Sequence, residues 1–196
     1  MTSISEDAIK QLFTEARTYP GWLPEPVSDE ALHAVYDLMK WGPTSANLSP
    51  ARILFVKSPE AKEKLFPCLM PLNVDKVKAA PVTAIIAHDV EYYELIPQLF
   101  PHGTGFLPAF RENQGFRETT GLRNGSLQGA YFIMAARAVG LDCGPMSGFD
   151  NAKLDEVFFA GTKWKSNFIC NIGHGDKQSL FPRLPRLSFE EACRII

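Results

Sequence analysis

Apolar residues recur in the first forty positions at the spacing of two amphipathic helices. The first predicted helix begins at Ser5, which can cap it, and runs to about Thr18. The second begins at Ser28 and ends at Trp41-Gly42-Pro43, where glycine and proline stop it. We therefore expect two helices in this part of the chain, separated by a short connection.

Three later apolar runs predict buried strands, at 53–56, 82–87 and 167–172. Ser58-Pro59 follows the first run as an N-cap and a first-turn proline, which predicts a further helix. Ser188-Phe189-Glu190-Glu191 fits the capping box of a short C-terminal helix. Strands that alternate with helices indicate a layered fold of the α/β or α+β class.

The longest helical pattern covers about 117–139 and ends at Gly140. Gly125 and Gly129 lie four residues apart on one face of this helix. Each glycine costs about 1 kcal/mol relative to alanine in a helix interior, so close packing or a ligand should compensate. We therefore expect a central or interface helix, whose glycine face permits close approach of another helix.

The segment 99–115 holds two prolines and three glycines, which is too many for a regular element. We predict a long loop there. Long loops in compact domains are commonly lids or binding segments, with plain disorder as the alternative.

Composition limits the class of protein. The chain has 196 residues, of which 45% are hydrophobic and 21% charged, so we expect one domain that spans 1–196. Its net charge of −2 gives nucleic acid no strong attraction. Its uncharged stretches fall short of the ~20 apolar residues that a membrane-spanning helix needs, and its first residues do not resemble a signal peptide. We expect a soluble, cytoplasmic protein without nucleic-acid or membrane partners.

The reactive side chains form none of the familiar catalytic patterns. Cysteines and histidines are scattered without zinc-site spacing, so we expect reduced, mostly buried thiols and no metal site. The glycine patterns of dinucleotide-binding Rossmann folds and P-loops are missing, as is the nucleophile elbow of serine hydrolases. If the protein is an enzyme, a cofactor is expected to carry its reaction.

Two loops are dense in small hydrogen-bonding groups. Pro43-Thr44-Ser45-Ala46-Asn47-Leu48-Ser49-Pro50 could grip a polar ligand, or could be an ordinary helix-to-strand turn. Gly144-Pro145-Met146-Ser147-Gly148-Phe149-Asp150 could present backbone N–H groups to a heterocycle, or could be a tight interhelical connection with Asp150 as an N-cap.

Arginines at both ends of the chain could bind a phosphate, because the guanidinium fork matches its oxygens. The candidates are Arg17, beside Thr18, and Arg183 and Arg186 in the last predicted loop. Each of them alone is typical of a solvated surface charge.

Taken together, in this order and spacing, the clusters resemble the nitroreductase family of FMN-dependent NAD(P)H oxidoreductases over nearly the full chain. The resemblance implies an α+β, three-layer fold with a central, mostly antiparallel sheet flanked by helices. It also implies an intertwined homodimer with FMN at the subunit interface, and NADH or NADPH as the hydride donor.

The same resemblance implies three sets of FMN contacts. The phosphate contacts are Arg17, Thr18 and either Arg183 or Arg186. The flavin contacts from the first loop, often given by the partner subunit, are Thr44, Ser45 and Asn47. The contacts near flavin N5, the atom that accepts and gives hydride, are Pro145, Met146, Ser147 and Gly148.

Longer strings are similar to the malonic semialdehyde reductase subgroup of pyrimidine degradation. They are Lys40-Trp41-Gly42-Pro43-Thr44-Ser45-Ala46-Asn47, the segment 144–150, and Arg183-Leu184-Pro185-Arg186-Leu187-Ser188-Phe189-Glu190-Glu191. This similarity implies reduction of malonic semialdehyde to 3-hydroxypropionate by ping-pong hydride transfer through flavin N5. No residue is certain to be catalytic; Arg123 and Arg111 could bind the substrate carboxylate, and His102 could donate a proton.

Two other functions share these cofactor contacts. A broad-specificity nitroaromatic or quinone reductase would differ mainly in the segment 99–115 and the neighbouring pocket. A non-enzymatic flavin-binding protein would hold FMN without a productive nicotinamide site.

Overall fold

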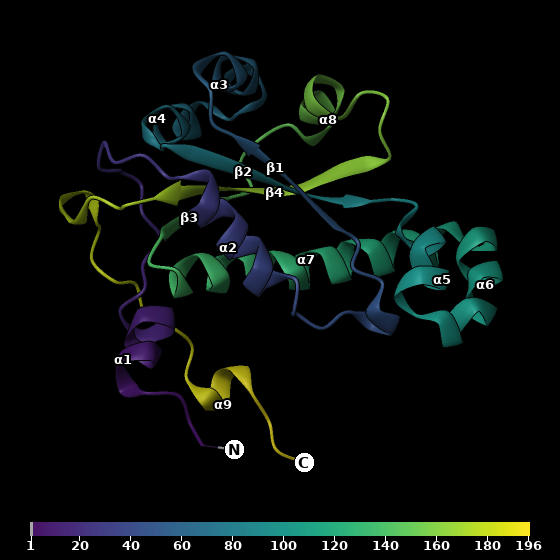
Figure 1. Ribbon diagram of the computed structural model, residues 1–196. Coiled ribbons are helices and arrows are strands. Elements are labelled where there is room, and N and C mark those ends of the chain that lie inside the picture. Colours follow the sequence, from purple (N-terminus) through teal and green to yellow (C-terminus); the bar gives the residue numbers. More distant parts are fainter. Residues whose placement is uncertain (1) are drawn as a thin grey trace.

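A four-stranded antiparallel sheet forms the centre of the computed structural model, which describes residues 2–196 (Figure 1). Its strands are β1 (Ala51–Val56), β2 (Val82–Asp89), β3 (Asp142–Met146) and β4 (Trp164–Gly173). The strand order is β1-β2-β4-β3, so β1 and β3 form the two edges.

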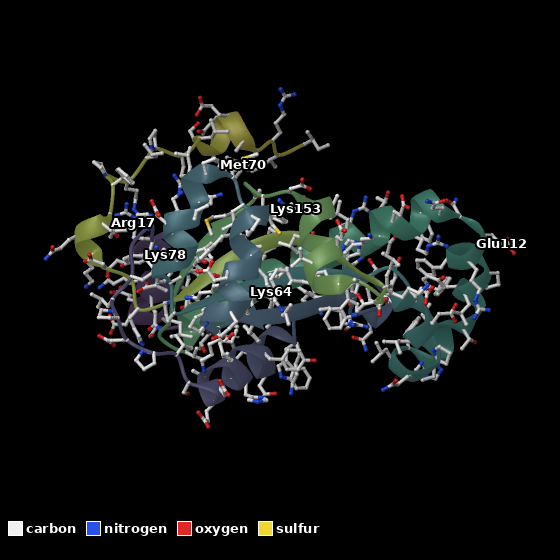
Figure 2. All side chains as sticks on the ribbon, turned by 90° about the horizontal axis from the view of Figure 1, so that it is seen from above. Arg17, Lys64, Met70, Lys78, Glu112 and Lys153 are labelled. Carbon is white, nitrogen blue, oxygen red and sulfur yellow. The ribbon has the colours of Figure 1, made fainter. Side chains whose placement is uncertain are left out.

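Helices cover both faces of the sheet. α2 (Asp29–Met39) and α7 (Gln114–Ala138) lie on one face. α3 (Pro59–Leu65), α4 (Pro71–Ala79) and α8 (Asn151–Phe159) lie side by side on the other, as the view from above shows (Figure 2). A separate apolar core lies between the sheet and each helical layer. The predicted α+β, three-layer arrangement is confirmed.

Short elements connect these layers. They are α1 (Glu6–Ile9) with its π-helical continuation η1 (Lys10–Thr14), η2 (Ser45–Asn47), η3 (Phe66–Cys68), η4 (Tyr92–Leu95), α5 (Ile96–Leu99), η5 (Pro101–Phe106), α6 (Leu107–Glu112), η6 (Lys177–Ser179) and α9 (Phe189–Ala192).

The predicted helix starts are confirmed by their caps. The side chains of Ser5, Ser28, Ser58, Asp150 and Ser188 each accept a hydrogen bond from the backbone N–H three residues later. The capping box of the last helix is complete.

The first helix ends at Thr14 instead of about Thr18. Thr18 forms a parallel bridge with Cys143, and the Tyr19 N–H donates to the Cys143 carbonyl at 3.0 Å. Because the edge of β3 binds this backbone, residues 18 and 19 are extended.

The prediction of a long loop at 99–115 is wrong, because η5, α6 and the start of α7 occupy the segment. Pro101 and Pro108 lie in the first turns of their helices, where a missing N–H leaves no hydrogen bond unmade. A side chain at Gly103 would collide with the ring of Phe100, 2.0 Å from an ideal Cβ. The two prolines therefore begin short helices, and the glycine allows close packing, so these residues do not prevent helix formation.

α7 is the central helix that was expected, and its glycine face allows close approach of the sheet instead of another helix. A Cβ at Gly129 would be 2.4 Å from the ring of Phe168 on β4. A Cβ at Gly125 would be 3.2 Å from His88 on β2. The glycines allow a central helix to approach strands that carry large side chains.

β3 and α4, two of the elements that build the three layers, were not predicted. β3 contains Gly144 and Pro145, which made it resemble a loop, yet proline is tolerated on the outer side of an edge strand. α4 buries only Asn73 and Val77, so it has no apolar stripe to reveal it.

Cys68, Cys143 and Cys170 are buried free thiols, whereas Cys193 is exposed. Within residues 2–196, none of the helices combines the length and the apolar character that crossing a bilayer requires.

Candidate functional site

A cleft of about 290 Å³ lies along the outer edge of β3. Four parts of the chain line it: the segment after the first helix, α4, the last residues of β3 and the C-terminal segment. The lining residues are Thr18, Tyr19, Pro20, Lys76, Gly144, Pro145, Met146 and Phe181. The cleft thus joins three predicted cofactor contacts from distant parts of the sequence: Thr18, Pro145 and Met146.

The edge of β3 leaves a backbone donor open near this cleft. The Cys143 carbonyl points outward, since it accepts the Tyr19 N–H. Strand alternation then places Pro145 and Ser147 on the same outer side. Proline has no N–H, and among residues 2–196 the Ser147 N–H has no acceptor. This N–H is therefore available to an acceptor atom of a ligand.

Two arginines join the N-terminal and C-terminal segments beside the cleft. Arg17 Nη2 donates to the Phe181 carbonyl at 2.5 Å, and Arg183 Nη2 donates to the Ala16 carbonyl at 3.0 Å. A guanidinium has five N–H donors, so both retain donors for an anion. Arg186 instead donates to the carbonyls of Leu184 and Pro185 in its own segment.

α4 contributes Lys76, which the sequence analysis missed. Lys76 Nζ donates to Asn73 Oδ1 at 3.1 Å, and Asn73 Nδ2 donates to the Gly148 carbonyl at 2.9 Å. The Met70 N–H donates to the same carbonyl at 3.0 Å. A side chain at Gly148 would lie 2.5 Å from Asn73 Nδ2, which explains the glycine. Asn73 and Lys76 are three positions apart and so lie on one helix face. This spacing was the sequence signal that could have indicated them as candidate site residues.

The charge at the cleft is positive. Among its lining residues, Lys76 is the one with a charged side chain. Burial raises the pKa of Tyr19, the nearby Asp142 raises it further, and Arg17 opposes them. Tyr19 is therefore a neutral phenol at physiological pH, and the cleft favours an anionic or electron-rich ligand.

The loop predicted to contact the flavin lies away from the β3 cleft. The Ser45 N–H donates to Asn124 Oδ1 at 2.8 Å, and Asn47 Nδ2 donates to the Leu99 carbonyl at 2.8 Å. Thr44 Oγ1 accepts the Ser49 N–H at 3.1 Å. These contacts fix the loop beside the first half of α7, whereas β3 follows the other end of that helix. One chain therefore does not bring this loop to the β3 cleft.

This loop is strained. Ala46, Asn47 and Ser49 have φ angles of 48°, 53° and 42°, in the left-handed region that non-glycine residues rarely adopt. Strain of this kind concentrates at ligand sites.

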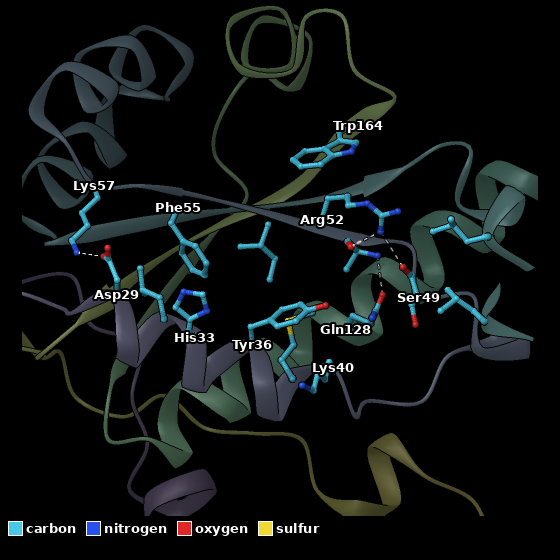
Figure 3. Close-up of a pocket in the computed structure, with 16 residues that line it drawn as sticks. Asp29, His33, Tyr36, Lys40, Ser49, Arg52, Phe55, Lys57, Gln128 and Trp164 are labelled. Carbon is cyan, nitrogen blue, oxygen red and sulfur yellow. Dashed lines mark hydrogen bonds and ion pairs between the residues drawn. The ribbon is translucent and has the colours of Figure 1, made fainter.

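A larger cavity of about 840 Å³ lies between α2 and the open edge of β1 (Figure 3). Its charged side chains are already paired: Lys57 Nζ lies 2.6 Å from Asp29 Oδ1, and Arg52 Nη2 lies 3.0 Å from Asp89 Oδ2. Of the residues predicted to bind FMN, none lines it within the described chain. We therefore take the smaller cleft as the candidate site, despite the difference in volume.

The three candidate substrate residues line neither cavity in a single chain. Arg111 on α6 donates to both carboxylate oxygens of Glu94, at 2.9 and 2.5 Å. Arg123 on α7 and His102 on η5 are exposed. Their roles stay predictions.

Comparison with known proteins gives matches along nearly the whole chain. The profile of the nitroreductase family matches residues 1–174. A protein of Ralstonia pickettii, which carries the name NADH dehydrogenase/NAD(P)H nitroreductase HadB, is 57% identical over 190 residues, covering 96% of this chain and 97% of the relative. A protein of Cupriavidus pinatubonensis with the same enzyme name is 54% identical, covering 97% of this chain and 98% of the relative.

Solved structures share the fold at low sequence identity. A nitroreductase-type protein of Exiguobacterium sibiricum, solved in complex with FMN, has a TM-score of 0.84 at 18% identity, with all of both chains covered. The ydfN protein of Bacillus subtilis has a TM-score of 0.85 at 20% identity, covering 98% of this chain and 100% of that one.

Proposed function

Because the chain belongs to the nitroreductase family, we propose that it is an FMN-dependent NAD(P)H oxidoreductase that reduces malonic semialdehyde to 3-hydroxypropionate. The observation that carries the proposal is the cleft at β3, which Lys76 lines and beside which lie Arg17, Arg183 and the open Ser147 N–H. The FMN complex of the Exiguobacterium protein, which shares the fold, supports the cofactor.

The residues at the cleft fit FMN. Arg17, Arg183 and Thr18 would hold the phosphate through charge-assisted hydrogen bonds. Lys76 would face the flavin and stabilise the negative charge that reduction places on it. The Ser147 N–H would donate to N5, next to the surface formed by Pro145 and Met146.

When bound, FMN would supply hydride transfer at N5 between NADH or NADPH and the aldehyde carbon of the substrate, and a proton from water would complete the alcohol. The protein residues orient the two reactants and hold the flavin, so no paired acid and base is required. Backbone rigidity at Ser147 and Gly148 is the main contribution, and the hydrogen bonds from α4 to the Gly148 carbonyl support it.

A homodimer would complete the site. The loop with Ser45 and Asn47 can reach the β3 cleft only from a second copy, since its own contacts fix it elsewhere. Apolar side chains stay exposed on α7, after α2 and along the C-terminal segment, as expected of surfaces that pair. They include Leu122, Leu127, Tyr131, Trp41, Leu184, Ile195 and Ile196.

A broad-specificity nitroaromatic or quinone reductase is the second candidate, and the names of both relatives favour it. It would use the same flavin contacts. It would differ in the residues that contact the substrate, which the segment with η5 and α6 is expected to supply.

The visible spectrum of the purified, FMN-reconstituted protein tests the proposal in two steps. Bound flavin is expected, and anaerobic NADH or NADPH should bleach it. A protein without flavin would refute the cofactor, and bound flavin that neither nucleotide reduces would identify a non-enzymatic flavin-binding protein. The turnover ratio between malonic semialdehyde and a nitroaromatic compound then separates the two enzymatic candidates.

A further inference from the structure

Two buried polar side chains connect the centre of the sheet to α4. Thr83 on β2 and Asn171 on β4 are direct register partners, with 0% and 1% of their surface exposed. Thr83 Oγ1 donates to Asn171 Oδ1 at 2.7 Å, and Asn171 Nδ2 donates to the Lys76 carbonyl at 2.9 Å. The buried pair therefore holds the backbone of the residue that carries the positive charge of the cleft.

Packing alone fixes α4 weakly. Of its nine residues only Asn73 and Val77 are buried, and Val74 packs partly buried against the same core as Val77. This narrow apolar contact leaves much of the position of the helix to be fixed by polar contacts. Hydrogen bonds hold it instead, from Asn73 Nδ2 to the Gly148 carbonyl in the first half and from Asn171 to the Lys76 carbonyl in the last turn. These two contacts connect α4 to the segment after β3 and to β4, and α4 in turn carries Lys76 to the cleft.

The chemistry of the pair suits holding a backbone carbonyl. Burying an amide and a hydroxyl is unfavourable unless both are hydrogen-bonded, and apolar residues of similar shape would fill the same space. In the Thr83 and Asn171 pair, the hydroxyl satisfies the amide oxygen and leaves the amide N–H to the Lys76 carbonyl. These two hydrogen bonds fix the orientation of the Asn171 amide, so that its N–H group points toward α4.

We infer that Thr83 and Asn171 are positioning residues that hold Lys76 at the cleft and thereby raise the reduction potential of the bound flavin. The inference rests on the proposed function, since it needs FMN in this cleft. A cation at short, fixed distance favours the reduced, more negative flavin, and the Coulomb interaction weakens as the distance grows. Releasing the Lys76 backbone therefore lowers the potential without removing any group that touches the cofactor.

The test measures the midpoint potential of bound FMN against a reference dye. Lys76→Met should lower it, and Asn171→Leu should lower it in the same direction by a smaller amount. The double variant should match Lys76→Met alone, because the two residues act through one charge. Thr83→Val should lower the potential, whereas Thr83→Ser, which keeps the hydroxyl, should retain the wild-type value.

Ser166→Ala is the matched control. Ser166 lies on the same strand as Asn171, is also buried, and its hydroxyl accepts a hydrogen bond from Asn151 Nδ2 at 2.9 Å. Among residues 2–196 it forms hydrogen bonds with Asn151 and Asp155 and none with α4. Its loss should leave the potential unchanged. If Asn171→Leu does not fold, the comparison of Thr83→Val with Thr83→Ser decides the question.

The inference would be overturned by an unchanged potential in Asn171→Leu or Thr83→Val, or by a shift in the double variant equal to the sum of the single shifts. An unchanged potential in Lys76→Met would also overturn it. These outcomes leave FMN binding intact and concern the inference alone. Wild-type protein that takes up no FMN would instead refute the proposed function on which the inference rests.

Discussion

Arg17 and Arg183 each donate a hydrogen bond to the backbone of the segment that carries the other. The guanidinium of Arg17 binds the Phe181 carbonyl, and that of Arg183 binds the Ala16 carbonyl. The exchange joins the two arginine-bearing segments beside the β3 cleft, although the residues lie at opposite ends of the sequence. Within one chain, Arg183 is therefore better placed than Arg186 to meet a phosphate beside Arg17.

Replacing either arginine should weaken FMN binding. A hydrogen bond to a charged group contributes about 1.5–3 kcal/mol, so Arg17→Ala and Arg183→Ala should each raise the Kd by roughly ten- to hundred-fold. Quenching of flavin fluorescence during titration of the apoprotein measures this. Arg186→Ala is the control, with a smaller effect expected, and a larger effect for Arg186 than for Arg183 would reverse the assignment.

A charge on the exposed face of α7 should break the proposed dimer. Leu127 has 48% of its surface exposed, so Leu127→Glu is tolerated by an isolated chain but buries a charge in an interface. Sedimentation at low micromolar concentration should show a wild-type dimer and a Leu127→Glu monomer that loses FMN. Val157→Glu, at a position 42% exposed on α8 on the opposite face of the sheet, should remain dimeric. A wild-type monomer that keeps its flavin would contradict the shared site.

His88 should make the fold acid-sensitive. Burial lowers its pKa, with Asp155 and Asp89 opposing the shift, and its Nδ1 is buried without a partner. Because the unfolded chain binds this proton near pH 6.5, it gains protons before the folded chain does. Stability is thus complete above about pH 6.5 and falls as the pH drops toward the lowered pKa of the folded state.

Thermal unfolding between about pH 7.5 and pH 5.5 measures this loss. His88→Gln should flatten the decrease in Tm across that window, since the substituted side chain does not titrate. An equal slope in the wild type and the variant would show that other groups cause the acid sensitivity.

The sequence predicted those elements whose determinants are local. Ser28 and Ser188 act as caps within one turn of their helices, and the apolar run at 82–87 is long enough to indicate a buried strand by itself. β3 escaped prediction because its conformation depends on β4 and on the backbone of Tyr19, both distant in sequence. Local pattern cannot reveal such an edge strand when it contains a proline.

The predictions for the candidate site show the same difference between local and distant determinants. Arg17, Pro145 and Met146 are predicted because they match short family strings, and their roles stay predictions. Lys76 was not predicted, because the spacing of Asn73 and Lys76 on one helix face does not by itself point to the cleft. Its position depends on Asn171, almost one hundred residues later, and on the Gly148 carbonyl. The neighbour of the α7 glycines could not be predicted for a related reason: spacing shows which residues share a helix face, but not what packs against that face.

Arg123 is the strongest remaining candidate for the substrate carboxylate. Within residues 2–196 it has no ion pair, whereas Arg111 is already bound to Glu94. It lies one turn before Leu127 on the exposed side of α7, so the proposed dimer would carry it toward the site of the partner subunit.

Arg123→Gln should therefore raise the KM for malonic semialdehyde by about ten-fold, the effect of one charge-assisted hydrogen bond, while changing the KM for a neutral quinone much less. Steady-state kinetics with both substrates measures the difference, and Arg111→Gln serves as the control. Equal changes for the two substrates would mean that Arg123 binds no carboxylate.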